Sequence, residues 1–135
     1  MSANYSSKHG IVGRSPMELF MLFTDLRNFE KMVPANIDAS ISADFDHLSA
    51  SMKGISIGVR VAERLPYSKI VFESEQSPFD FRITVNLTDL GGNRTDFSID
   101  FDAQLSGIYK MLIGNKINQA LDQIVDSLVQ ASAHI

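Results

Sequence analysis

The sequence contains no cysteine, no cluster of lysine and arginine, and no long apolar run. Without cysteine the chain has no disulfide, thiolate zinc site or cysteine nucleophile, which fits a reducing compartment. No stretch approaches the roughly 18 apolar residues of a membrane span, and residues 1–15 lack the apolar segment of a secretory signal. We therefore expect a cytoplasmic protein without stable membrane insertion.

The charges that are present carry both signs and are interspersed, with a formal net charge of −4. A nucleic-acid partner requires clustered basic residues that neutralise phosphates, and anionic lipid requires the same. We expect neither partner. The nucleophile elbow Gly-x-Ser-x-Gly, the phosphate-binding P-loop and the dinucleotide fingerprint are also missing. The sequence therefore indicates no catalytic residue and no cofactor.

The histidines do not predict a metal site. His9, His47 and His134 lie in three separate segments, and no pair has the i, i+4 spacing of a helical metal motif. Asp44 and Asp46 precede His47, but an aspartate-rich hairpin turn is the favoured interpretation, because aspartate side chains stabilise turns locally. We predict no metal ligand.

Length and composition favour a single domain, 1–135, with its own core. Domains commonly run about 100–150 residues, and a hydrophobic content of 44% supports a core without a disulfide or metal. Residues 4–14 predict a short strand. A helix should follow, because Ser15 can cap it, Pro16 suits its first position and Glu18 can complete a capping box. We expect residues 25–28 to divide this segment into two short helices.

From residue 37 to residue 105 the apolar period changes from 3.6 to 2. Such alternation predicts an antiparallel sheet with one buried and one wet face. The clearest strands lie at 55–62, 79–88 and 96–105, and weaker strands lie near 37–42, 47–53 and 68–75. A broad apolar stripe over 107–132 then predicts a long helix.

The phase of the last two strands predicts the loop between them. Odd-numbered residues face inward on both sides of 91–93. Two odd-numbered residues can face each other only if an odd number of residues separates them, so a two-residue turn is excluded and a three-residue loop with glycine in the left-handed region is favoured. Leu90 would then face Arg94. The same register places Arg82 opposite Asp102 on the wet face, as a cross-strand ion pair.

Two segments resemble a known family. Ser15-Pro16-Met17-Glu18-Leu19-Phe20 and the run from Phe23 to Pro34 resemble the helical opening of the START-like (SRPBCC) superfamily, which includes pollen-allergen-type proteins and polyketide cyclases. The resemblance covers nearly the whole chain. It implies an α+β helix-grip fold, in which a curved antiparallel sheet of about seven strands (β-α-α-β6-α) wraps around the long C-terminal helix. It also implies a cavity for a hydrophobic ligand between sheet and helix.

The residues expected to line that cavity are apolar positions of the inner face and the helix, together with one serine. A pocket that orients its ligand needs only a few polar groups, and Ser74 is in phase with the inner face. The predicted ligand-binding residues are Val59, Phe72, Ser74, Phe81, Ile83, Phe101, Ile108, Met111 and Leu112. The alternative is that these side chains fill a solid core.

Three functions remain open from the sequence. The favoured one is binding of a hydrophobic small molecule, lipid-like or polyketide-like. A polyketide-cyclase-like enzyme would need a buried ionisable residue, for which Glu63 is the candidate because it continues the inward set after Val61. The third is a cavity-free interaction module, which pairs through a sheet edge or through apolar helix residues such as Ile113 and Val129 and permits a homodimer.

Overall fold

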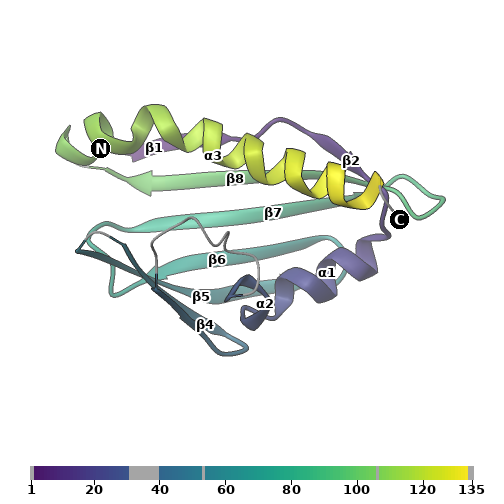
Figure 1. Cartoon of the computed structure of the whole chain (residues 1–135), viewed down its shortest axis with the longest axis horizontal. Helices are drawn as coiled ribbons and strands as arrows, with labels where there is room; N and C mark the ends of the chain where they lie inside the picture. Colours follow the sequence, from purple (N-terminus) through teal and green to yellow (C-terminus); the bar gives the residue numbers. More distant parts are fainter. Residues whose placement is uncertain (1, 31–39, 53, 106, 134–135) are drawn as a thin grey trace.

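The computed structural model describes residues 2–30, 40–52, 54–105 and 107–133 (Figure 1). They form one curved sheet, two short helices after its first strands, and a long helix at the end, so the predicted α+β helix-grip class is confirmed. The elements are β1 (Ser2–Ser6), β2 (Gly10–Val12), α1 (Pro16–Thr24), α2 (Arg27–Glu30), β3 (Ser40–Ala43), β4 (His47–Met52), β5 (Ile55–Leu65), β6 (Lys69–Glu75), β7 (Phe81–Asp89), β8 (Thr95–Gln104) and α3 (Gly107–Ala133).

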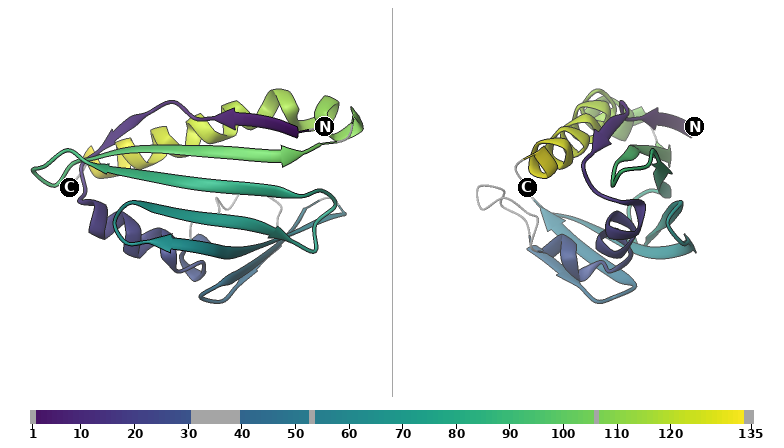
Figure 2. Two further views of the ribbon diagram at one scale, coloured as in Figure 1. Left: turned by 180° about the vertical axis from the view of Figure 1, so that it is seen from behind. Right: turned by 90° about the vertical axis from the view of Figure 1, so that its right-hand side faces the viewer.

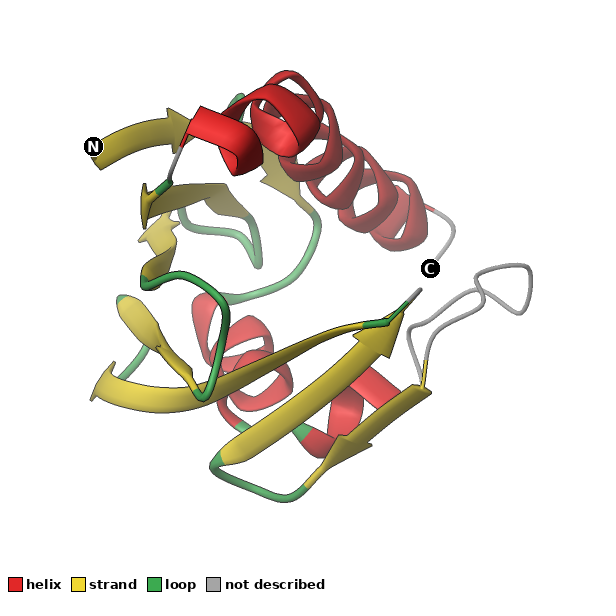
Figure 3. Ribbon diagram, turned by 90° about the vertical axis from the view of Figure 1, so that its left-hand side faces the viewer, coloured by secondary structure: helices red, strands yellow, loops and turns green. Residues whose placement is uncertain are grey.

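The sheet has eight strands in the described part of the chain, where about seven were predicted. The difference arises at the N-terminus, where the strand expected over 4–14 is two strands that both pair with β8. The strand order is β1-β8-β7-β6-β5-β4-β3, and every pairing is antiparallel. Figures 2 and 3 show that α3 and the pair α1–α2 lie on the concave side of this curved sheet.

Two of the predicted local signals are present in the structure. The N–H of Glu18 donates to Ser15 Oγ at 3.2 Å, so α1 begins with the expected cap. In the loop between β7 and β8, Leu90 N–H donates to Arg94 O at 3.0 Å. Gly91, Gly92 and Asn93 all have positive φ, which confirms the three-residue loop.

The core occupies one end of the concave face, which we call the closed end. It is formed by α1, β2, the C-terminal part of α3, and the sheet positions that they cover. Phe23 and Phe97 stack there with ring centroids 5.4 Å apart. The buried side chains of the closed end are Val12, Leu19, Phe20, Phe23, Leu26, Ile70, Phe72, Val85, Leu87, Phe97, Ile99, Leu121 and Val125.

The helix α3 rests directly on the backbone of β2. An added Cβ on Gly10 would lie 2.5 Å from Val125 Cγ1 and 2.9 Å from Val129 Cγ2, far inside ordinary contact distance. Lys8 strengthens this contact, because its N–H donates to Asp122 at 2.7 Å and its ammonium pairs with Asp126 at 2.5 Å. Val125 is fully buried as a result. Glycine at position 10 therefore sets how closely the helix approaches the sheet.

Replacing Gly10 with alanine should destabilise the protein. Overpacking a tight contact commonly costs about 1–3 kcal/mol, and chemical denaturation should show a loss in that range. The control is Gly107→Ala, because nothing lies within 4 Å of a Cβ added there. In the double variant Gly10→Ala/Val125→Ala the two costs should be less than additive, since the second change removes the atoms that clash. Additive costs would show that the contact does not limit the packing.

Candidate ligand-binding site

The opposite end of the concave face is incompletely covered, and we call it the open end. Phe81, Ala103 and Leu105 are buried there, but the apolar side chains around them keep part of their surface exposed. These partly buried side chains are Tyr5, Ile57, Val59, Phe79, Ile83, Phe101 and Ile117. A contiguous apolar surface that the protein does not fully cover is a candidate site for an apolar ligand.

Strand register brings most of the predicted site residues together. Ile83 lies opposite both Phe72 and Phe101, and Val59 lies opposite Ser74. Phe72 belongs to the closed end, where it is 4% exposed. The sheet residues that meet at the open end are thus Val59, Ser74, Phe81, Ile83 and Phe101, which remain our candidates for ligand contact.

The helix residues are placed differently from the expectation. Ile108 is 70% exposed and Met111 is 83% exposed, whereas Ile117 packs against the open end. At about 100° per residue, Ile108 lies roughly 140° and Met111 roughly 80° around the helix from the buried Leu121. The apolar stripe of 107–132 therefore divides into two faces. The side chain of Leu112 lies outside the described residues, so its predicted role stays a prediction.

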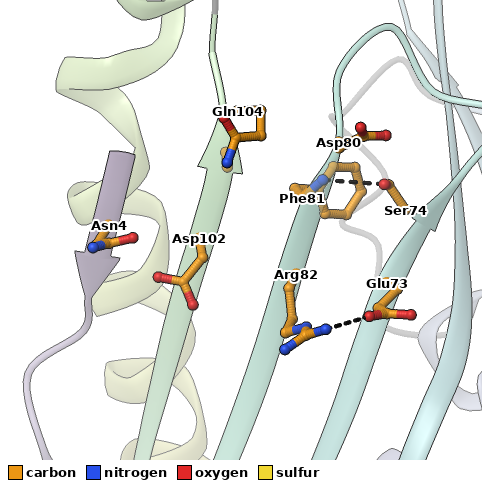
Figure 4. A pocket seen from close by; sticks show the side chains of 9 residues that line it. Asn4, Glu73, Ser74, Asp80, Phe81, Arg82, Asp102 and Gln104 are labelled. Carbon is orange, nitrogen blue, oxygen red and sulfur yellow. Dashed lines mark hydrogen bonds and ion pairs between the residues drawn. The ribbon is translucent and has the colours of Figure 1, made fainter. Parts of the chain in front are cut away.

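Ser74 is a polar residue at the open end of the concave face, opposite Val59. Its Oγ accepts the N–H of Phe81 at 3.0 Å, so its own hydroxyl proton can be donated to another group. The backbone pairing of β6 with β7 extends only to Glu73 and Arg82, one residue before this bond. A separate pocket of about 440 Å³ lies at the same end of the sheet but mainly on its convex face (Figure 4), where Asn4, Glu73, Arg82 and Asp102 line it together with Ser74, Asp80, Phe81, Ala103 and Gln104.

Glu63 does not face the concave side. The prediction that Glu63 is a buried ionisable residue for acid–base chemistry is therefore wrong. A β-bulge shifts the register of β5 between Val61 and Glu63, so Glu63 lies opposite Val71 and its side chain is exposed. The extra residue of a bulge reverses the phase of every later position in the strand. Arg64 therefore turns to the side that Glu63 was expected to occupy, opposite Ile70.

Arg64 was missed by the sequence interpretation, and it fastens α1 to the sheet. Its Nε donates to Thr24 Oγ1 at 2.5 Å and its Nη2 to Thr24 O at 2.9 Å. The same guanidinium pairs with Asp46 at 2.7 Å and lies 4.6 Å from the ring centre of Phe45. The bond to Thr24 O satisfies one of the backbone carbonyls that a helix end leaves unpaired.

The convex face of the sheet carries a band of charges. Arg82 lies opposite Asp102, as predicted, but its ion pair is with Glu73 at 2.6 Å on the other neighbouring strand. Arg60 pairs with Glu73 at 2.7 Å from the opposite side. The hydrogen bond from Arg82 is the main cause that lowers the pKa of the Glu73 carboxyl below its ordinary value. Glu73 thus stays ionised and holds β5, β6 and β7 together.

The hairpin before β4 confirms the turn interpretation of its aspartates. Asp44 Oδ1 accepts the N–H groups of Asp46 at 2.9 Å and His47 at 2.7 Å. The His47 ring bonds Glu75 Oε2 at 2.9 Å, and this hydrogen bond raises the pKa of His47 above its ordinary value of 6.5. The imidazolium is therefore favoured in the folded protein.

Because the pKa of His47 is raised on folding, its bond to Glu75 should stabilise the protein at low pH and lose this effect as the pH rises through the folded pKa. The difference in Tm between the protein and His47→Gln should shrink from about pH 5.5 to about pH 8.5. An NMR titration of the His47 ring should give a midpoint above 6.5, which Glu75→Gln should lower. A Tm difference that is constant over this range would contradict the assignment.

The sequence matches no protein-family model and no curated protein. Solved structures do match it. A point mutant of norcoclaurine synthase from Thalictrum flavum, in complex with a transition-state analogue, superimposes with a TM-score of 0.75 over 99% of this chain and 96% of that chain, at 8% identity. A protein from Rhizobium loti gives a TM-score of 0.64 over 90% of this chain and 92% of that chain, at 18% identity.

The chain has the helix-grip fold. The resemblance to the START-like superfamily, predicted from the helical opening, is confirmed at the level of the fold. Norcoclaurine synthase has also been solved with dopamine and hydroxybenzaldehyde; that structure gives a TM-score of 0.73 at 7% identity, over 99% of this chain and 88% of that chain. Similarity at these identities concerns the fold and assigns no ligand or reaction.

Proposed function

We propose that this helix-grip protein binds a hydrophobic small molecule at the open end of its concave face, between the sheet and α3. Proteins with this fold typically hold hydrophobic ligands in a cavity between these elements. The observation that supports the proposal most is the contrast along one face. Val85 and Leu87 of β7 are 3% and 5% exposed at the closed end, whereas Ile83 on the same strand is only partly buried at the open end.

The apolar burial that a useful affinity requires sets a scale for such a site. A micromolar Kd corresponds to about −8 kcal/mol. Covering apolar surface is favourable by roughly 25 cal/mol per Å², so about 330 Å² supplies this energy before the cost of association is subtracted. A ligand that covers the partly exposed rings and branched side chains of the open end would bury surface of this kind.

Binding is favoured over a cyclase-like reaction because of the polar groups at the open end. Acid–base catalysis requires an ionisable group within hydrogen-bond reach of the reacting atom. The described residues that form the open end supply the hydroxyls of Ser74 and Tyr5. Glu63, the carboxylate proposed for the enzyme alternative, is exposed on the other face. No helix in the described part of the chain is long and apolar enough to cross a membrane.

A charge placed at the open end should weaken binding strongly without unfolding the protein. Val59 is partly buried there, and Val59→Lys should weaken binding of an environment-sensitive apolar dye at least tenfold, because the ammonium cannot be desolvated against the ligand. Thr88→Lys is the matched control, since Thr88 is exposed on β7 opposite Asp96. Fluorescence titration gives both affinities and thermal unfolding confirms folding. Failure of the unaltered protein to bind any apolar dye would refute the proposed function.

A further inference from the structure

We propose that the ligand of the open end contains a flat aromatic ring system, which stacks on the partly exposed rings in a row of four aromatic side chains. This inference rests on the proposed function and specifies its ligand class. The row runs Tyr5, Phe101, Phe81, Phe79 and crosses β1, β8 and β7, with Phe79 just before β7.

The rings of the row are in continuous contact. Phe81 and Phe101 stack with centroids 5.6 Å apart and planes 13° apart. Phe79 lies 5.7 Å from Phe81 at 54°, and Tyr5 lies 6.3 Å from Phe101 at 58°. All three distances fall within the 4.5–7 Å typical of favourable aromatic pairs. The row therefore presents one joined aromatic surface, as opposed to isolated rings.

Register explains why the two central rings stack. Tyr5 lies directly opposite Phe101, but Phe81 lies opposite Ala103, so Phe81 and Phe101 are diagonal neighbours. Diagonal positions lie about 7–8 Å apart, which aromatic side chains can bridge. The small side chain of Ala103 leaves room for the ring of Phe81 to turn towards Phe101. A larger residue at position 103 would separate them.

The row is incompletely covered in the free protein. Phe81 is 7% exposed, while Tyr5, Phe79 and Phe101 are only partly buried. Any apolar ligand gains free energy by covering this surface, but a planar aromatic ligand gains the ring–ring term as well, which corresponds to about 2- to 13-fold in affinity per pair. A site for a ligand with a saturated hydrocarbon chain would need only aliphatic side chains, such as Val59 and Ile83 on the same face.

The charge of the site further limits the ligand. Among the described residues that form the open end, none is charged at neutral pH, and Ser74 can donate one hydrogen bond. A buried unpaired charge on the ligand would be costly in this setting. The expected ligand is therefore a neutral, planar aromatic molecule with at most a few polar atoms.

The test compares two probes with the same carbon skeleton, planar 2-naphthol and its saturated analogue decahydro-2-naphthol. Isothermal titration calorimetry on the full chain should show at least tenfold tighter binding of 2-naphthol. Phe101→Leu, which removes the ring and keeps an apolar side chain, should weaken 2-naphthol about tenfold and the saturated probe less than threefold. Phe45→Leu is the matched control, because it removes a ring that is 44% exposed beside Arg64, outside the row, and it should leave the preference unchanged. Phe79→Leu provides a second variant if Phe101→Leu does not fold.

Fluorescence locates the probe independently. The chain has no tryptophan and three tyrosines, Tyr5, Tyr67 and Tyr109, so excitation transferred to bound 2-naphthol comes from tyrosine. Tyr5→Phe keeps a ring in the row but removes this donor, so at a saturating concentration of 2-naphthol it should reduce the transferred emission. Tyr67→Phe, at an exposed turn position, should change it less.

The outcomes separate the inference from the proposed function. Equal affinity for the two probes, or an equal loss for both in Phe101→Leu, would overturn aromatic stacking while leaving hydrophobic binding intact. Unchanged transferred emission in Tyr5→Phe would overturn the placement on the row. Absence of binding by both probes and by apolar dyes would refute the proposed function itself.

Discussion

The close approach of α3 to the backbone of β2 at Gly10 is the constraint on which the rest of the structure depends. It buries Val125 completely and aligns the helix along β8. Because the helix is seated through its C-terminal half, Leu121 and Val125 cover the closed end, whereas Ile117 is its described contact at the open end. The uneven cover of the sheet thus follows from where the helix is held.

Because the cover is uneven, the two ends of one sheet face differ: the closed end is packed and stabilises the fold, and the open end is the proposed binding site. At the closed end α1 and α3 complete the packing, and Arg64 ties the last residue of α1 to β5 and to the hairpin before β4. At the open end the same strands present rings and branched side chains with surface left to cover. On the convex face, Glu73 pairs with Arg60 and Arg82 and so links β5, β6 and β7. Surface charge pairs of this kind contribute little individually, so the apolar contacts carry most of the stability.

Much of the fold could be predicted because its signals are local. Ser15 and Glu18 cap α1 within a single turn, and the parity of the two strands around residues 91–93 restricts the loop to an odd length. Alternation likewise separates the concave from the convex positions of β7 and β8. Alternation also placed Val59, Phe81, Ile83 and Phe101 on the concave face, where they meet at the open end, and their contact with a ligand stays a prediction. Tyr5 was missed, because β1 reaches the site only by pairing with β8. Tyr5 lies opposite Phe101, which is 96 residues away in the sequence.

The sequence by itself therefore determined the secondary structure, the two faces of the sheet and the apolar character of the site, since each depends on spacing within one segment. Three features were decided only by the tertiary structure. The bulge in β5 turns Glu63 to the convex side and Arg64 to the concave side. The close contact at Gly10 determines which apolar stripe of α3 is buried. Arg82 forms its ion pair with Glu73 instead of Asp102. Each of these is a choice between alternatives that are equivalent in local sequence, and it is resolved by contacts with residues distant in the chain.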